Sequence, residues 1–228
     1  MGGEGRRSLN AASGSNRSPL SRHGLAFVFV GSFCLLWPAF FFGGPFPFAD
    51  TGPYLAQGAA ILDALLQIVA GWLREPPPSS TVGAAAAAAE TSPVEALSRR
   101  ADMMRSLPYA VFAHVANASP LGRFGVAFAQ SAIVLAAIWP LAAAAIEERP
   151  RGAAAATVFI AVGTSLAWFV CFLMPDVMGA VVVAFALTLI AVVDRIDAAG
   201  RVALALLAAF AVMTHYGNIA LAAGLIGA

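Results

Sequence analysis

The sequence is poor in charge and contains no lysine. Charged residues make up 11% of its 228 residues, and all 13 basic side chains are arginines. The formal net charge is only +1, and no basic stripe is present that could neutralise a nucleic-acid backbone. This composition excludes DNA and RNA as partners.

Cysteine and the familiar enzyme motifs are scarce as well. The two cysteines, Cys34 and Cys171, both fall inside apolar runs, which excludes a disulfide framework or a zinc site and predicts two small buried hydrophobes. The sequence has no P-loop, no G-x-G-x-x-G, no G-x-S-x-G and no H-E-x-x-H. The signatures of common soluble enzymes are therefore missing.

Long apolar runs dominate what is present. Hydrophobic residues make up 60% of the chain, and the mean hydropathy is +0.82. A helix needs about 20 apolar residues to cross a bilayer, and a spanning segment must be helical to satisfy its backbone. The sequence therefore predicts an all-α transmembrane bundle of about five spans, at residues 24–43, 124–146, 154–174, 177–193 and 202–225.

Arginine placement predicts the orientation of these spans. Residues 1–23 are polar, rich in glycine and serine, and carry four arginines, which indicates a disordered cytoplasmic tail before one transmembrane domain over 24–228. The first run is too long for a signal core and is closed by no A-x-A site, so we interpret it as an uncleaved anchor. The loops "EERPRG" and "DRIDAAGR" then lie inside, and "MPDV" lies outside. The all-arginine composition is typical of a GC-rich bacterial genome, so we expect a bacterial inner-membrane protein with a cytoplasmic amino terminus.

A long outer loop, residues 44–123, contains two unusual segments. Residues 74–100 form a proline- and alanine-rich insert without candidate chemistry. Residues 57–73 are apolar enough to be a sixth span, but Asp63 and Gln67 share one helical face, and a central aspartate costs about 2.5–3.5 kcal/mol on insertion. We interpret this segment as an amphipathic helix on the outer surface, with a sixth span as the alternative.

Five polar side chains fall on the predicted outer side. Asp50 follows the first span, Asp176 lies in the outer turn "MPDV", and Arg105 belongs to the outer loop. His215 and Tyr216 come about 13 residues, or roughly 20 Å, after the start of the last apolar run, which places them in the outer leaflet. Ionisable groups at this depth are functional candidates, so we take Asp50 and Asp176 as candidate catalytic acids and the other three as candidate substrate-binding residues.

Each candidate also has a purely structural interpretation. Asp50 in "ADTGPY" is a typical turn former, and Asp176 is a suitable N-cap for the helix that follows it. His215 is suited to a hydrogen bond with its own neighbours inside an apolar helix. Arg105 is suited to a contact with lipid headgroups or with the surface.

Four stretches carry a resemblance to a known family. They are "FPFADTGPYLAQGAA", "RSLPYAVF", "LMPDVMGAVV" and "HYGNIALAAGL". Together they resemble bacterial multi-spanning proteins of the GT-C glycosyltransferase-like group, over residues 24–225 without the insert. The first outer loop lacks the pair of adjacent acids that is usual in the family, and the chain has about five predicted spans where the family has seven or more, so the resemblance indicates a truncated or divergent member.

The resemblance implies a reaction and roles. The family transfers a sugar from a polyprenyl-phosphate donor on the outer face, and the acid of the first outer loop acts as catalytic base or metal ligand. Asp50 would be that acid, Asp176 a second acid and Arg105 a contact to the donor phosphate. This leaves open a divalent cation as cofactor, with membrane lipids and the polyprenyl-phosphate donor as partners. The alternatives are a non-catalytic membrane assembly protein and a transporter subunit.

Overall fold

The computed structural model describes residues 21–73, 106–146 and 150–227. Of these residues 84% are helical and none forms a strand, so the predicted all-α class is confirmed. The insert 74–100 and nearly all of the predicted tail lie outside the described residues. The boundary at residue 24 is slightly late, because α1 already begins at Arg22, with the Ser21 hydroxyl accepting the Gly24 N–H at 3.0 Å.

The helices follow one another in three groups along the chain. The first group comprises α1 (Arg22–Leu35), α2 (Trp37–Phe41), α3 (Thr51–Leu73) and α6 (Leu107–Asn117). The second comprises α7 (Arg123–Ala145), α8 (Pro150–Gly163) and α9 (Leu166–Cys171). The third comprises η2 (Pro175–Met178), α10 (Gly179–Ala191), η3 (Val193–Arg195), α11 (Ala198–Thr214) and α12 (Tyr216–Gly227).

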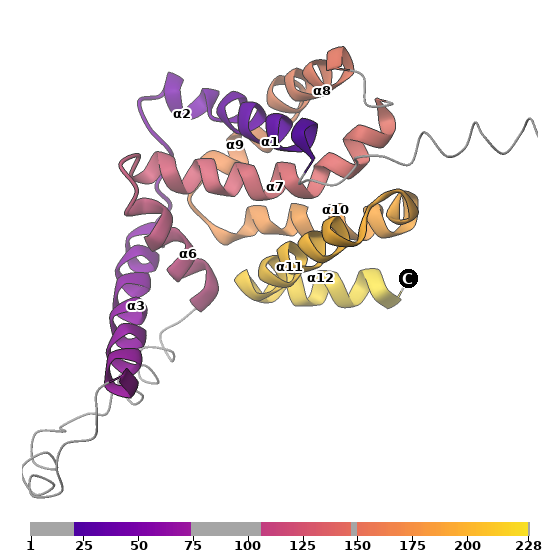
Figure 1. The fold of residues 1–228 in the computed structure, drawn as a ribbon. Coiled ribbons are helices and arrows are strands. Elements are labelled where there is room, and N and C mark those ends of the chain that lie inside the picture. Colours follow the sequence, from indigo (N-terminus) through magenta and orange to yellow (C-terminus); the bar gives the residue numbers. More distant parts are fainter. Residues whose placement is uncertain (1–20, 74–105, 147–149, 228) are drawn as a thin grey trace, which may run out of the picture.

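Helix α7 is the centre of the packing. Figure 1 shows α1, α2, α8 and α9 on one side of it and α10, α11 and α12 on the other. Val134, Leu135 and Trp139 of α7 are at most 1% exposed, and the Trp139 ring packs against Phe27 of α1 with 5.0 Å between centroids. The hydrophobic core therefore extends along α7, and the helices on both sides pack against it.

The outside of the bundle is apolar. Large hydrophobic side chains on α1, α8, α10 and α11 are more than half exposed: Phe29, Phe159, Val162, Ile190 and Leu206. Hydroxyl groups within the helices donate to the carbonyl oxygen four residues earlier, as at Ser32 (2.7 Å) and Ser131 (2.8 Å). Both serines are fully buried, so these bonds satisfy hydroxyl groups that no solvent reaches in the core.

Three helical stretches of the described residues are long and apolar enough to cross a membrane: Arg22–Phe41, Thr51–Leu73 and Arg123–Ala145. The first and third coincide with predicted spans at 24–43 and 124–146. The predicted span at 177–193 is present as the shorter helix α10, flanked by the 3-10 turns η2 and η3. The structure therefore supports the positions of these three apolar segments.

Two predicted spans are wrong as single helices. The segment 202–225 is broken at His215, and Figure 1 shows α12 turning back beside α11. The segment 154–174 is split into α8 and α9, and the backbone is extended at Phe172 and Met174. The break at His215 and the extended segment after α9 place irregular backbone at one end of the bundle, where its polar groups need new partners.

Helix α3 runs crosswise to α7 and projects from the end of the bundle (Figure 1). It packs mainly on α6, through buried Tyr54, Gly58 and Ile61. A side chain at Gly58 is excluded, because its Cβ would lie 2.1 Å from the carbonyl oxygen of Ala110 in α6. This close pairing holds the start of α3, and with it the loop that carries Asp50, at the end of the bundle.

Candidate functional site

The loop that carries Asp50 is bound to the extended segment after α9. The Phe46 N–H donates to the carbonyl oxygen of Cys171 at 2.9 Å, and the Leu173 N–H donates to the carbonyl oxygen of Phe46 at 3.3 Å. These bonds form an isolated parallel bridge between Phe46 and Phe172. The loop before α3 and the segment before η2 are therefore joined, although 126 positions separate them in the sequence.

Thr51 makes a second connection between the same two segments. Its hydroxyl donates to the carbonyl oxygen of Leu173 at 3.2 Å and accepts the Phe48 N–H at 2.8 Å. The carbonyl oxygen of Asp50 accepts the Tyr54 N–H at 2.9 Å, so Asp50 lies at the entry to α3. Asp50 is thus fixed at a helix start whose neighbour, Thr51, is only 4% exposed.

A buried amide holds the segment that leads to Asp176. Gln130 of α7 is fully buried, and its Nε2 donates to the carbonyl oxygens of Phe172 (3.3 Å) and Met174 (3.2 Å). The Tyr109 hydroxyl donates to Oε1 of Gln130 at 3.3 Å. Extended backbone between two helices leaves its carbonyl groups without helical partners, and Gln130 supplies those partners.

Asp176 lies within the 3-10 turn η2 rather than at a helix cap. The N-cap of η2 is Met174 and that of α10 is Met178, and neither makes a side-chain capping bond. The alternative interpretation of Asp176 as an N-cap for the next helix is therefore wrong. Its side chain is 56% exposed and faces His215.

His215 lies at the break between α11 and α12, and both of its ring nitrogens are engaged. Its backbone is extended, with φ −154° and ψ 135°. The Gly217 N–H donates to Nδ1 at 3.1 Å, and Nε2 lies 3.7 Å from Oδ1 of Asp176. Because Nδ1 accepts a hydrogen bond, the ring proton is placed on Nε2, toward Asp176. Nδ1 of His215 thus makes the expected structural hydrogen bond with a chain neighbour, and Nε2 faces the carboxylate of Asp176.

The break itself is built from two small features. Asn218 is 5% exposed, its Nδ2 donates to the carbonyl oxygen of Ala211 at 2.7 Å, and its N–H donates to the carbonyl oxygen of His215 at 2.9 Å. A Cβ on Gly217 would lie only 2.9 Å from Nδ1 of His215. Gly217 thus leaves room for the imidazole, and Asn218 bonds a carbonyl that the ended helix leaves open.

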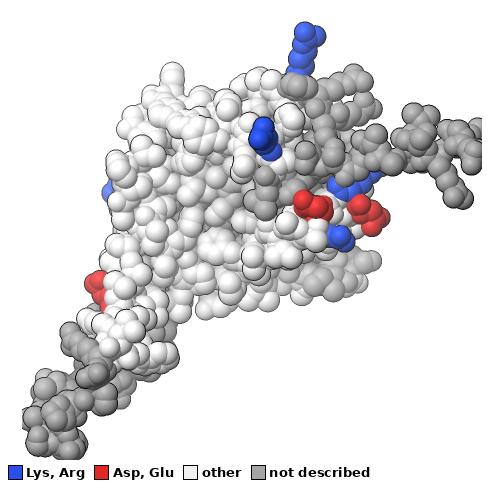
Figure 2. All heavy atoms as spheres, in the orientation of Figure 1, with Lys and Arg blue, Asp and Glu red and all other residues white. Residues whose placement is uncertain are grey.

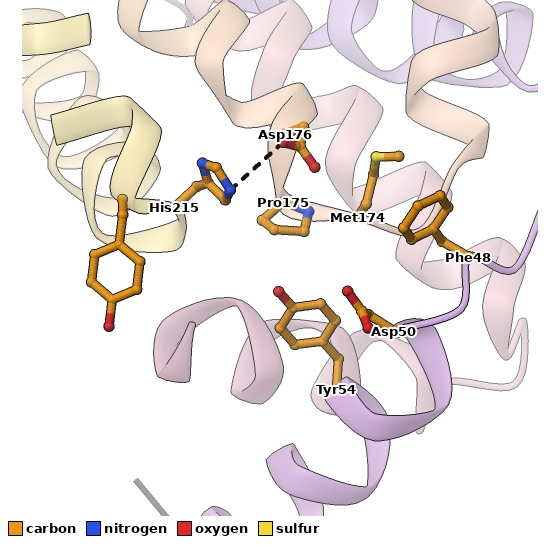
Figure 3. Close-up of a pocket in the computed structure, with 8 residues that line it drawn as sticks. Phe48, Asp50, Tyr54, Met174, Pro175, Asp176 and His215 are labelled. Atoms are coloured by element: carbon orange, nitrogen blue, oxygen red, sulfur yellow. Dashed lines mark ion pairs between the residues drawn. The ribbon is translucent and has the colours of Figure 1, made fainter. Parts of the chain in front are cut away.

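These elements surround one polar pocket of about 270 Å³. Figure 3 shows Asp50 and Tyr54 on one wall and Asp176 and His215 on the other. The remaining lining residues are Phe48, Met174, Pro175 and Tyr216. Two aspartates, a histidine and two tyrosines thus line a cavity at the end of an apolar bundle.

Four of the five predicted site residues line this pocket: Asp50, Asp176, His215 and Tyr216. The fifth, Arg105, lies outside the described residues. The structure thus brings the four together, while the catalytic and binding roles assigned to them stay predictions.

Tyr54, Tyr109 and Gln130 were not predicted. Tyr54 follows Asp50 by four positions, a spacing that places two side chains on the same face of a helix, so this signal was readable. Gln130 is a lone amide in the apolar run "GVAFAQSAIV", which marks it as a polar group in need of a partner. The sequence does not say which carbonyl groups that partner would be.

Burial raises the pKa of Tyr109 well above its ordinary value, and the nearby Tyr54 and Asp176 act in the same direction. The Tyr109 ring also meets the Tyr54 ring edge-on, with 5.1 Å between centroids. Tyr109 therefore remains a neutral hydroxyl donor to Gln130 at physiological pH.

The described residues contain no group of three or more His, Cys, Asp or Glu side chains placed to hold a metal ion. Asp50, Asp176 and His215 share the pocket without forming such a set. The divalent cation that the resemblance leaves open therefore stays a prediction.

Comparison with known proteins gives no relative: no family model, no curated protein and no solved structure matches this chain.

Proposed function

We propose that this chain is a multi-pass protein of the bacterial inner membrane. The apolar exterior of the bundle supports this, because contiguous exposed apolar surface of this kind marks contact with lipid. Figure 2 shows most of the coloured charged side chains on the right-hand side, where Figure 1 shows the starts of α8 and α11. Arg22, Arg151, Arg195 and Arg201 all lie at helix starts or turns of this end, as expected for a cytoplasmic face.

The pocket lies at the opposite end and therefore faces the outer side in this orientation. η2 and the starts of α3 and α12 meet there (Figure 1). α11 has 17 residues, so the two ends are about 25 Å apart, close to the thickness of the hydrocarbon layer. A ligand with a lipid anchor would thus present its polar head at the level of the pocket.

The proposed reaction is transfer of one sugar from a polyprenyl-phosphate donor to a hydroxyl group. The acceptor oxygen attacks the anomeric carbon, and the bond from that carbon to the phosphate oxygen breaks. The hydroxyl proton passes to a carboxylate, and the phosphate leaves with the bonding electrons. The cavity volume of about 270 Å³ lies near the lower limit of small-molecule sites, which is about 300 Å³. A cavity of this size suits a ligand as small as a single sugar ring.

The single observation that carries this proposal is the presence of Asp50 and Asp176 in one pocket. Asp50, at the entry to α3, is the proposed base that accepts the hydroxyl proton. Asp176, on the opposite wall, is placed to stabilise positive charge that develops on the sugar ring. Nε2 of His215 lies 3.7 Å from Oδ1 of Asp176, which is longer than a hydrogen bond, so a substrate oxygen could accept the Nε2 proton instead.

The test is sugar transfer by membrane vesicles that contain the full chain. The donors are polyprenyl-phosphate glucose, mannose and arabinose, each labelled in the sugar, and the acceptors are the endogenous components of the vesicles. Asp50→Asn keeps the shape but removes the base, so we expect transfer to fall about 100-fold or more at an unchanged protein level.

Asp63→Asn is the matched control, because Asp63 is an exposed carboxylate on α3 that does not line the pocket. It should keep the wild-type rate. Full activity of Asp50→Asn would remove Asp50 from catalysis. No transfer by the folded wild-type protein from any of the three donors would favour the alternative, a non-catalytic assembly protein or transporter subunit.

A further inference from the structure

A second pocket with a single charged side chain lies beside the first. It has a volume of about 500 Å³ and is lined by the loop 42–47 on one side and by Arg123 and Phe124 on the other. None of these residues lines the pocket of Asp50 and Asp176. This cavity, which we call the Arg123 pocket, is therefore a separate site.

The charge of Arg123 is not compensated within the described part of the chain. Its side chain is exposed, and no carboxylate of residues 21–73, 106–146 or 150–227 forms an ion pair with it. Every other lining residue is apolar, glycine or proline. The chemistry of the pocket thus favours an anion, and the planar guanidinium matches a phosphate with two parallel hydrogen bonds.

The backbone of the loop is open to a ligand. Gly43 has φ 81°, a left-handed conformation that glycine adopts at low cost. A Cβ on Gly43 or on Gly44 would meet nothing within 4 Å. The main chain at Gly43 and Gly44 is therefore exposed in the pocket, and a side chain at either position would cover it.

Aromatic side chains surround the Arg123 pocket at the end of the bundle. Phe40 stacks on Phe124 with 5.3 Å between centroids, and Phe42 contacts Trp168 at 5.6 Å. Phe41 is 76% exposed. Aromatic rings gather where a membrane protein crosses from hydrocarbon to headgroups, so Arg123 lies at headgroup level.

We propose that the Arg123 pocket binds the phosphate of an anionic phospholipid headgroup. This inference rests on the membrane placement of the proposed function but not on sugar transfer, and the two are tested by separate measurements. The lipid chains lie against the exposed phenylalanines of α2, and the phosphate reaches Arg123 and the bare loop. Such a lipid would fix the height of the pocket that holds Asp50 relative to the membrane surface.

The test is lipid binding to the full-length protein by native mass spectrometry in detergent. Phosphatidylglycerol and zwitterionic phosphatidylcholine are titrated separately, and a third arm adds inorganic phosphate to the phosphatidylglycerol complex. We expect the wild type to prefer phosphatidylglycerol. Arg123→Gln should weaken that binding about 5-fold, which is the usual contribution of one arginine near an anionic membrane surface.

Two pairs of variants make the result decisive. Arg201→Gln removes an exposed arginine from the opposite end and should keep the preference. Gly44→Asp places a negative charge in the pocket without touching Arg123 and should abolish the preference, while the neutral Gly44→Asn should retain more of it. If both Arg123→Gln and Gly44→Asp bind like the wild type, the site is refuted. Displacement of phosphatidylglycerol by inorganic phosphate would assign the pocket to the free ion and overturn the lipid proposal.

Discussion

The Tyr109 hydroxyl is buried where water cannot solvate a phenolate. Its side chain is 1% exposed and donates to Gln130 at 3.3 Å. A raised pKa in the folded state means that folding favours the protonated phenol. The stabilising contribution is therefore complete below the ordinary tyrosine pKa of about 10 and is lost as the pH rises above it.

We expect the purified protein to lose stability steeply above pH 10. In the unfolded chain Tyr109 ionises, whereas in the folded chain it stays neutral, so the free energy of unfolding falls by up to about 1.4 kcal/mol per pH unit. Tyr109→Phe should be less stable at pH 8, by about 1 kcal/mol for the lost hydrogen bond, but should show a shallower alkaline decline. Thermal unfolding between pH 8 and pH 11 measures both effects.

Tyr216→Phe is the control for this prediction, since Tyr216 is 71% exposed. It should follow the wild-type curve at every pH. An alkaline decline that is equally steep in Tyr109→Phe would assign the effect to other groups of the protein and contradict the role given to burial.

The sequence predicted part of this site for a physical reason. Asp50 and Asp176 lie at the predicted outer ends of apolar runs, and His215 and Tyr216 lie in the outer half of the last run, so the alternation of spans alone brings all four to one side. It could not predict the partners of Gln130, because the carbonyl groups of Phe172 and Met174 are open only where a helix stops. That stop is a property of the packed structure.

At the scale of elements, Gln130 joins the central helix α7 to the extended segment between α9 and η2. Gln130→Leu keeps the volume but removes the partner of the Met174 carbonyl oxygen and of the Tyr109 hydroxyl, while the Phe172 carbonyl oxygen keeps the Met174 N–H at 2.9 Å. Unsatisfied buried polar groups cost about 1–3 kcal/mol each. We expect this variant to lose about 2–4 kcal/mol of stability, and thermal unfolding in detergent measures the loss.

Ser131→Ala is a matched change one position further along α7. Ser131 is also fully buried, but its hydroxyl bonds only to the carbonyl oxygen of Ala127 in its own helix. It should lose less than about 1 kcal/mol, because that carbonyl keeps its helical partner. Equal losses in the two variants would show that Gln130 acts by packing alone and does not hold the segment before Asp176.

Element boundaries were harder to predict than element positions. The run 202–225 is apolar on both sides of His215, so hydropathy predicts one continuous span. The structure breaks it because His215 adopts extended backbone and Asn218 bonds the carbonyl oxygen of Ala211, a contact that forms only when the chain turns. Apolar length determines that a segment is buried in lipid or core, whereas such local bonds determine where it ends.

Helix α3 also shows that apolar length alone does not determine whether a segment spans the membrane. It has the length and hydropathy of a span, yet its exposed surface is divided between Leu66 and Val69 on one stripe and Asp63 and Gln67 on another. This amphipathic pattern and its crosswise direction (Figure 1) fit a helix that lies at the membrane surface. If α3 spanned, the chain would need a return crossing before α7, and α6, the helix that the structure describes between α3 and α7, has only 11 residues, about 17 Å.

At the scale of the whole molecule, the status of α3 does not change the side on which later helices begin. Figure 1 shows that α2 ends and α7 begins at the same end of the bundle. The bridge between Phe46 and Phe172 holds the end of α9 there as well. The pocket and the charged end are therefore on opposite sides of the bundle, whatever α3 does.

This arrangement predicts the sidedness of single cysteines in living cells. In a chain with Cys34→Ala and Cys171→Ala, we expect Tyr216→Cys to react with a membrane-impermeant maleimide in intact spheroplasts. Arg201→Cys should react only after permeabilisation, because α11 separates the two positions by about 20 Å of apolar helix. Labelling of both sites from outside, or of Arg201→Cys alone, would place the charged end outside and overturn the proposed orientation.

Asp63→Cys adds the test of α3, since a helix at the surface leaves that position as reactive as Tyr216→Cys, whereas a spanning helix hides it in the bilayer.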